Sequence, residues 1–245
     1  MTSALQRQRR RAGITFALPA FVLVAIFLGI PIFQAGYFSF TKWDGITATW
    51  QGISTYTHEL TNPIFWRVIQ NNFLLLLAVP VAIILPMAIA FMLNEKVVGW
   101  KFFRSIYFLP TAISWVVIGM VAMRFFAAEG GLNQLLKTFG LGFIKTDFLS
   151  SEQGALFAVG AVFVWSMIGT NSIIFLTGMA TLDQSLNEAA HMDGAGALRI
   201  FWSITLPQLK RFIQFSFIIT VISAFTALFS LIFVMTGGGP GFGTT

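Results

Sequence analysis

The feature that most constrains this chain is a series of long apolar runs with almost no charge in them. Residues 12–41 contain no acidic or basic side chain. Four further apolar runs lie within residues 68–94, 105–123, 153–182 and 212–236. Each run reaches the roughly 20 residues that a helix needs to cross the hydrocarbon core of a bilayer. The sequence therefore predicts five transmembrane helices and an all-α, polytopic integral membrane protein.

Charge is scarce in the chain as a whole. Hydrophobic residues make up 56% of the sequence and charged residues 10%, whereas a soluble domain carries about 25% charged residues. Cysteine is absent, which excludes a disulfide framework and a thiolate metal site. Residues 1–11 are basic, but the apolar run after them is long enough to span a membrane. We therefore expect an anchored N-terminus rather than a cleaved signal peptide.

Lysine and arginine predict the side of the membrane on which each loop lies. With the N-terminus inside and the spans alternating, ten of the 15 cations fall on the cytoplasmic side, as the positive-inside rule favours for short loops. The net charge of +6 thus reflects membrane topology and not nucleic-acid binding, because the cations cluster at the ends of apolar runs. The cytoplasmic cations are Arg7, Arg9, Arg10, Arg11, Lys96, Lys101, Arg104, Arg199, Lys210 and Arg211, and the outer ones are Lys42, Arg67, Arg124, Lys137 and Lys145.

The most polar stretch between two long apolar runs is residues 187–207. Apolar and small residues at spacings of three and four predict a helix before Asp193-Gly194 and a second helix after it. Glycine ends a helix readily because it takes the left-handed conformation at little steric cost. Leu206-Pro207 marks the next boundary. The residues at helical spacing are Leu186, Ala189 and Ala190 before the turn, and Leu198, Phe201 and Trp202 after it.

These residues resemble the EAA loop of permease subunits in binding-protein-dependent ABC importers. In that family the loop is cytoplasmic and forms the coupling helix that docks into a cleft on the ATPase subunit. The resemblance implies that residues 183–210 form an ATPase-coupling loop, in the compartment that the cation count predicts. The alternative is a solvated loop with a chance Asp-Gly turn. The matching residues are Glu188, Ala189, Ala190, Asp193, Gly194, Ala195, Leu206 and Pro207.

Further short matches in the same order are similar to the sugar-permease branch, and to the first-type permease of maltose, glycerol-phosphate and multiple-sugar importers. This resemblance implies the type I ABC importer transmembrane-domain fold, with a single permease domain over residues 12–245 after the basic segment 1–11. It also implies a sixth helix, which this chain, ending at Thr245, lacks. The matches are Trp43-Asp44-Gly45, Phe65-Trp66, Phe102-Phe103-Arg104, Phe108-Leu109-Pro110, Gly131-Leu132-Asn133 and Thr236-Gly237-Gly238-Gly239-Pro240.

The resemblance implies the partners as well. They are a second permease subunit in a heterodimer, ABC ATPase subunits, and an extracytoplasmic solute-binding protein that delivers a small carbohydrate. The location implied is the plasma membrane of a bacterial or archaeal cell, with the N-terminus in the cytoplasm. Two alternatives from other classes stay open: a secondary carrier or channel, and a membrane scaffold without a transport role.

The chemistry of catalysis is missing from the sequence. There is no P-loop pattern, so ATP hydrolysis would belong to a partner subunit. The two histidines, His58 and His191, lie in loops on opposite sides of the predicted membrane and cannot share a metal. We therefore expect no catalytic, cofactor or metal site. Asp and Glu are absent from the middles of the five spans, which argues against proton-coupled transport through an intramembrane carboxylate.

Uncharged polar and aromatic residues within the spans are candidates for a substrate pathway. Amides such as Asn71 and Asn171 can pair with sugar hydroxyls, and the rings of Trp115 and Trp165 can stack on a sugar. Such polar side chains also hydrogen-bond between helices in membranes, and both interpretations stay open. Asn171 with Trp165 is the strongest candidate, because the fourth span leads directly into the 183–210 loop.

Prolines and glycines in the spans predict where helices bend or approach closely. A proline is tolerated in a transmembrane helix where neighbours satisfy the carbonyl that it frees. In the second outer loop, leucines three and four residues apart over residues 132–139 predict a short amphipathic helix. The prolines in or near the spans are Pro19, Pro31, Pro80, Pro86 and Pro110, and the candidate close-packing glycines are Gly160, Gly169 and Gly178.

Overall fold

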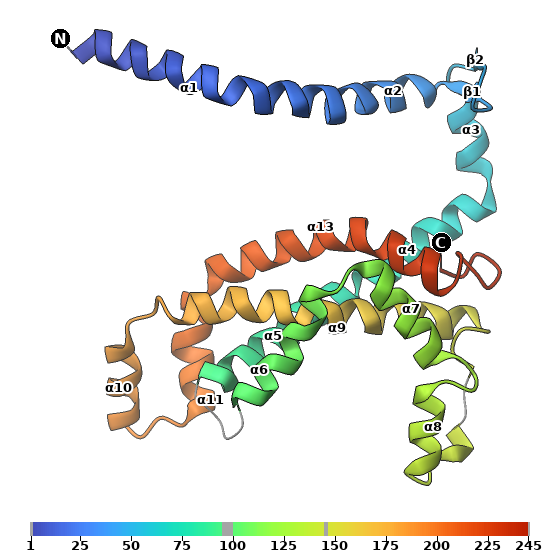
Figure 1. Ribbon diagram of the computed structural model, residues 1–245. Helices are drawn as coiled ribbons and strands as arrows, with labels where there is room; N and C mark the ends of the chain where they lie inside the picture. Colours follow the sequence, from blue (N-terminus) through green and yellow to red (C-terminus); the bar gives the residue numbers. More distant parts are fainter. Residues whose placement is uncertain (1, 95–99, 145–146, 245) are drawn as a thin grey trace. The chain divides into compact units, whose positions relative to one another are not determined.

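The computed structural model describes residues 2–94, 100–144 and 147–244. The chain divides into two compact units, Met1–Phe65 and Trp66–Thr245. Within the described residues, four helices are long and apolar enough to cross a membrane, and a bent pair of helices would make a fifth span. The all-α, polytopic class is therefore confirmed, and Figure 1 labels the helices that carry it.

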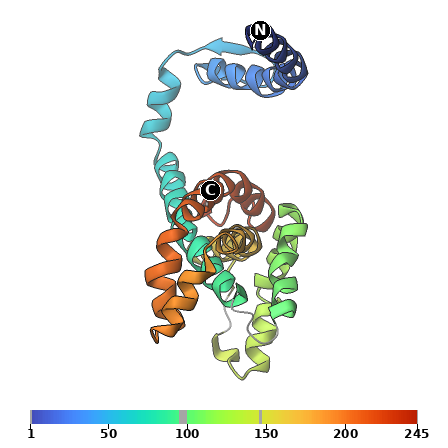
Figure 2. The same ribbon diagram turned by 90° about the vertical axis from the view of Figure 1, so that its left-hand side faces the viewer.

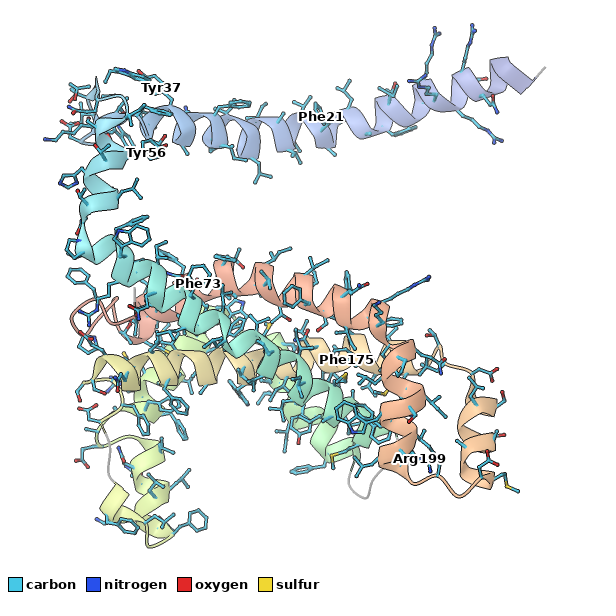
Figure 3. All side chains as sticks on the ribbon, turned by 180° about the vertical axis from the view of Figure 1, so that it is seen from behind. Phe21, Tyr37, Tyr56, Phe73, Phe175 and Arg199 are labelled. Carbon is cyan, nitrogen blue, oxygen red and sulfur yellow. The ribbon has the colours of Figure 1, made fainter. Side chains whose placement is uncertain are left out.

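The first unit begins with a long apolar helix, Gln6–Phe38, which confirms the first predicted span although the helix ends three residues before Thr41. A π-helical turn directly precedes Pro31, which lies in the first turn of the last segment. Such a turn can accommodate the backbone bond that proline cannot make. Phe21 is exposed and projects outward in Figure 3, as suits a helix in lipid. The segments are α1 (Thr2–Val24), η1 (Ala25–Gly29) and α2 (Ile30–Phe38).

A small antiparallel hairpin follows, which the all-α prediction did not include. Asp44 closes its turn: the carboxylate accepts hydrogen bonds from the backbone N–H groups of Thr47 (2.7 Å) and Ile46 (2.9 Å) and from the Thr47 hydroxyl (2.8 Å). These bonds lower the pKa of Asp44 to about 2. Gly45 supplies the positive φ of +96° that the turn requires. The elements are β1 (Thr41–Trp43), β2 (Ala48–Trp50) and the short helix α3 (Ser54–Thr61).

The second unit is a helical bundle built around α9, which Figure 2 views nearly along its axis. Helix α9 packs against α5, α7 and α13, and Phe163 and Phe175 on α9 are fully buried. Figure 3 shows Phe175 among the packed helices. Three predicted spans, over residues 68–94, 153–182 and 212–236, are thereby confirmed. The helices are α4 (Pro63–Leu76), α5 (Ala78–Asn94), α9 (Glu152–Met179) and α13 (Lys210–Met235).

The third predicted span, residues 105–123, is not one straight helix. Its two halves meet at an angle of 115°. Pro110 lies in a tight 3-10 turn and Ile113 is extended. Ser114 then caps the next helix, because its hydroxyl accepts a bond from the N–H of Val117 at 3.4 Å. The helix is therefore broken where a continuous span was expected. The segments are α6 (Trp100–Phe108), η2 (Leu109–Ala112) and α7 (Trp115–Phe126).

Glycines let two helices approach α9 closely. A Cβ on Gly169 would lie 2.5 Å from the carbonyl oxygen of Tyr107, and a Cβ on Gly178 would lie 2.8 Å from the ring of Phe212. Both distances are below any normal contact, so the predicted close-packing role is confirmed at these two positions. At Gly160 the nearest side-chain atom lies 3.7 Å away, which is ordinary contact and leaves room for a methyl group.

The remaining elements are short and lie outside the long helices. The predicted amphipathic helix over residues 132–139 is present as α8, and the amide of Asn133 donates to the carbonyls of Ala128 (3.1 Å) and Ala127 (3.3 Å) at the end of α7. Leu135 is half exposed. The short elements are α8 (Gly131–Thr138), η3 (Gly142–Ile144), α10 (Gln184–Met192), α11 (Ala197–Ile200), η4 (Phe201–Thr205) and α12 (Leu206–Gln208).

Candidate functional site

The loop over residues 183–210 begins with a capped helix. A carboxylate oxygen of Asp183 accepts a hydrogen bond from the backbone N–H of Ser185 at 3.0 Å, which satisfies one of the free donors at the start of α10. Hydrogen bonds from the side chain and backbone of Ser185 lower the pKa of Asp183. An ionised carboxylate at the positive end of the helix therefore fixes its start.

The same helix ends in a Schellman turn at Gly194. The backbone φ of Gly194 is +76°, and the N–H of Ala195 reaches back to the carbonyl of Ala190 at 2.9 Å. Nothing lies within 4 Å of the place that a Cβ on Gly194 would occupy. The backbone angle, and not lack of space, therefore requires glycine. The two helices predicted around a glycine turn are present as α10 and α11.

The surface of α10 and of the turn after it presents small and acidic side chains beside the larger apolar Leu186 and Met192. Glu188, Ala189 and Asp193 are exposed, and Ala190 and Ala195 are partly exposed. A hollow of about 260 Å³ opens beside the turn and contains one carboxylate, one guanidinium and one hydroxyl. The guanidinium is that of Arg199, labelled in Figure 3. The hollow is lined by Ala190, Asp193, Ala195, Arg199, Ile200, Ser203 and Ile204.

The second half of the loop is anchored in the bundle. The ring of Phe201 is buried and lies against the ring of Phe91 on α5, with centroids 4.9 Å apart. Leu206 packs against the core, whereas Pro207 is exposed. Leu209 is fully buried. Of the predicted coupling residues, three therefore line the hollow, while Leu206 helps to root the loop.

The two helices that flank the loop touch each other at its roots. Leu209 and Phe212 lie against Gly178, at 2.9 and 2.8 Å from the place of its Cβ. Since α9 enters the loop at Met179 and α13 leaves it at Lys210, this contact holds both ends of the loop together. The loop is therefore connected to α9 and α13 at its roots and to α5 through Phe201.

Asn171, a candidate for the substrate pathway, is fully buried among three helices. Its amide nitrogen donates to the carbonyl of Ala82 on α5 at 2.6 Å and to the hydroxyl of Thr220 on α13 at 3.0 Å. Its amide oxygen accepts from the hydroxyl of Ser216 on α13 at 3.0 Å. Both donor positions of the amide are used within the protein, which favours the helix-pairing interpretation of Asn171 over substrate contact.

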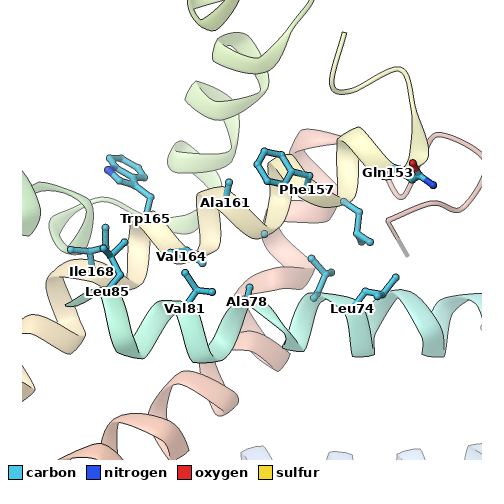
Figure 4. A pocket seen from close by; sticks show the side chains of 13 residues that line it. Leu74, Ala78, Val81, Leu85, Gln153, Phe157, Ala161, Val164, Trp165 and Ile168 are labelled. Carbon is cyan, nitrogen blue, oxygen red and sulfur yellow. The ribbon is translucent and has the colours of Figure 1, made fainter. Parts of the chain in front are cut away.

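Trp165 is the most accessible of the pathway candidates, because 43% of the residue's surface is exposed. It lies between two hollows. One is a groove of about 620 Å³ between α9 and the pair α4 and α5, shown in Figure 4, and the other, of about 440 Å³, lies beside α7. Apart from Gln153, the residues around the larger groove are apolar or glycine. An aromatic face in such a setting can stack on the apolar face of a sugar ring.

The other two candidates do not line either hollow. The ring of Trp115 stacks on Phe163 with centroids 6.3 Å apart. Asn71 is buried, and its amide donates to the carbonyl of Phe242 at 3.0 Å. Asn71 thus ties α4 to the segment after α13. The four pathway candidates are therefore spread over the bundle rather than brought to one of these hollows.

The glycine-rich segment after α13 packs over an ion pair. The guanidinium of Arg67 on α4 pairs with the carboxylate of Glu152 at the start of α9. A Cβ on Gly243 would lie 2.6 Å from the Cβ of Glu152, and a Cβ on Gly241 would lie 2.7 Å from its carboxylate. Thr244 is fully buried. The segment is therefore a packed turn and not a loose tail.

Sequence reasoning missed the partners of Asn171. Ser216 and Thr220 are four residues apart and so share one face of α13. Both are fully buried. Hydroxyls at that spacing in an apolar helix, together with Pro86 inside α5, are the signals that would have predicted a polar junction here.

Comparison with known proteins points to one family. The model of the family described as "Binding-protein-dependent transport system inner membrane component" matches residues 10–245. The multiple sugar-binding transport system permease protein MsmF of Streptococcus mutans is 34% identical over 236 residues, covering 95% of this chain and 80% of MsmF. The sn-glycerol-3-phosphate transport system permease protein UgpA of Brucella abortus is 31% identical over 230 residues, covering 91% of this chain and 76% of UgpA.

A solved structure shares the fold. A chain in the crystal structure of a bacterial ABC transporter involved in the import of the acidic polysaccharide alginate superimposes with a TM-score of 0.81. The match covers 99% of this chain and 83% of that chain, at 23% sequence identity. At that identity the likeness concerns the arrangement of the helices.

Proposed function

The chain belongs to the family of binding-protein-dependent transport system inner membrane components, and on this basis we propose that it forms the translocation pathway for a sugar or a related polyol or sugar phosphate in an ABC importer. The relatives MsmF and UgpA are named for multiple-sugar and glycerol-phosphate transport. Uncharged spans and the exposed ring of Trp165 suit such a cargo. The chain itself carries no P-loop, so the importer draws on separate ATPase subunits.

The observation that carries this proposal is the structure of the 183–210 loop, which presents an exposed helix between two anchored ends. Helix α10 is capped at Asp183, closed at Gly194, and presents Glu188 and Ala189 on its surface. Its small side chains leave room for the walls of a partner's cleft. Both roots of the loop are held by buried contacts. A stiff exposed helix on fixed roots is what a lever between two proteins requires.

The mechanism follows from that lever. ATP binding draws two ATPase subunits together and moves the coupling helices of this chain and of a second permease. The motion passes through the loop roots into α9, α13 and α5, and the spans rock from inward-facing to outward-facing. A receptor on the outer side then delivers the cargo, and ATP hydrolysis resets the spans. The N-terminus lies in the cytoplasm in this arrangement.

Co-purification tests the proposal. We expect an ATPase subunit to copurify with this chain in detergent extracts, and substitution of Glu188 and Ala189 by bulky residues to abolish it. The matched control is Thr49→Tyr in the hairpin of the first unit. Uptake of a radiolabelled sugar by vesicles without any copurifying ATPase would instead support a secondary carrier. An ATPase that stays bound after the loop is altered would contradict the proposed coupling role.

A further inference from the structure

Helix α5 contains a backbone defect that another helix repairs. Pro86 lies inside α5 and has no N–H, so it cannot bond the carbonyl of Ala82 one turn earlier. The amide nitrogen of Asn171 on α9 donates to that same carbonyl at 2.6 Å. Asn171 therefore supplies the hydrogen bond that the proline removes.

The repair extends to a third helix. The amide of Asn171 also exchanges hydrogen bonds with Thr220 and accepts one from Ser216, both on α13. The hydroxyl of Ser172 lies 3.4 Å from the carbonyl of Pro86. The side chains of this junction are all buried: Pro86, Asn171, Ser172, Ser216 and Thr220. Because an unpaired polar group in such a place is strongly unfavourable, the junction holds α5, α9 and α13 in one mutual arrangement.

Each of these three helices meets the 183–210 loop. Helix α9 enters the loop at Met179 and α13 leaves it at Lys210. Helix α5 meets the loop through the contact between Phe91 and Phe201. The polar junction around Asn171 lies beyond the loop roots, on the path from the loop into the bundle.

We propose that Asn171 is a positioning residue for coupling: by bonding the carbonyl freed at Pro86, it makes α5, α9 and α13 move as one body when the loop is displaced. This proposal rests on the proposed function of the loop. Asn171 acts through the helices that it joins and does not touch the cargo. Without it, α5 is free to bend at Pro86 independently of α9 and α13.

The test compares sugar uptake with ATP hydrolysis in the assembled importer. We expect Asn171→Leu, which keeps the branched shape of the side chain and removes the hydrogen bonds, to copurify with the ATPase and to hydrolyse ATP. Sugar taken up per ATP hydrolysed should fall at least about five-fold, the lower end of typical coupling between sites. The sugar preference should not change. Because retained ATPase binding shows that the loop functions, failure of this inference is distinguishable from failure of the proposed function.

A second substitution makes the test specific. Pro86→Ala restores the N–H that bonds the carbonyl of Ala82, so the double variant Pro86→Ala with Asn171→Leu should regain most of the lost uptake per ATP. The freed hydroxyls of Ser216 and Thr220 can bond carbonyls of their own helix. The matched control is Pro80→Ala with Asn171→Leu, which restores an N–H elsewhere in α5 and should give no recovery.

Three results would overturn the inference. The first is an unchanged ratio of uptake to hydrolysis in Asn171→Leu, whether or not the melting temperature of the complex falls, since Asn171 would then only stabilise the fold. The second is an altered sugar preference, which would return Asn171 to the substrate pathway. The third is equal recovery of uptake per ATP when Asn171→Leu is combined with Pro80→Ala or with Pro86→Ala. That result would mean that Asn171 does not act by bonding the carbonyl of Ala82.

Discussion

Asp183 and Gly194 act at opposite ends of the same nine-residue helix. Gly194 could be predicted from the sequence, because an Asp-Gly pair after a run of helical spacing is a recognisable stop. The cap at Asp183 was not predicted, since an aspartate at the edge of a polar loop does not by itself show where a helix starts. Asn171 was predicted either to contact substrate or to hydrogen-bond between helices. Its partners could not be identified without knowing which face of α9 meets α5.

At Gly194 we predict that Gly194→Ala destabilises the turn by roughly 1–2 kcal/mol, because an L-residue is strained in the left-handed region. Open space around the site means that the backbone angle alone produces the loss. ATP hydrolysis should continue while uptake falls, and Gly194→Leu should behave in the same way. Gly194→Asn is the control, because asparagine tolerates this conformation. Normal uptake by Gly194→Ala would contradict the lever.

At Asp183 we predict that Asp183→Ala increases amide hydrogen exchange in the first turn of α10, whereas Asp183→Asn retains most of the protection. The lowered pKa means that the stabilising charge is present above the ordinary value of 3.8 and is lost only as pH falls through the lower folded value. ATPase binding should therefore be indifferent to this group between about pH 5 and pH 8. If ATPase binding were lost between about pH 5 and pH 8 in the unsubstituted chain but not in Asp183→Asn, the capping role would be refuted.

Among the elements, length and hydropathy predict the long spans well, because a run of about 20 apolar residues is enough to identify a membrane helix. The broken third span shows the limit. Pro110 was noted in the sequence, but a proline in a membrane helix can be tolerated or can break it, and the outcome depends on its neighbours. The hairpin of Asp44 is three residues per strand, too short for a period-two pattern to be seen.

Helix contact gives a prediction at this scale. Gly169→Ala should destabilise the bundle by about 1–3 kcal/mol, because the added methyl group would overlap the carbonyl of Tyr107 and the side chain of Thr111. Thermal unfolding of the purified protein measures the loss. The control is Gly36→Ala in α2, where nothing lies within 4 Å and better helix propensity alone should act. Equal effects of the two substitutions would argue against close packing at Gly169.

For the whole molecule, the family and the membrane class were accessible from the sequence, because short matches in the correct order add up over the chain. The two compact units could not be foreseen, since nothing in composition distinguishes residues 1–65 from the remainder. The cargo stays a proposal: the residues around the grooves beside Trp165 are mostly apolar, and apolar walls do not discriminate among sugars.

The absence of cysteine makes the orientation of the whole chain testable. We predict that Ala189→Cys is protected from a membrane-impermeant maleimide in intact cells and is labelled in inverted vesicles. Thr49→Cys in the hairpin should show the opposite pattern. The unsubstituted chain is the blank. Labelling of Ala189→Cys from outside intact cells would place the loop on the wrong side and would refute the proposed topology.

The hydrogen bond between the Asn171 amide and the Ala82 carbonyl also has an evolutionary consequence. Asparagine is useful at position 171 because position 86 is proline, so the two residues should covary among related sequences. In descendants where the proline has been replaced, selection on the asparagine should relax and substitutions there should accumulate. If the asparagine were replaced first, the carbonyl of residue 82 would be left without a hydrogen bond, and that intermediate should be selected against.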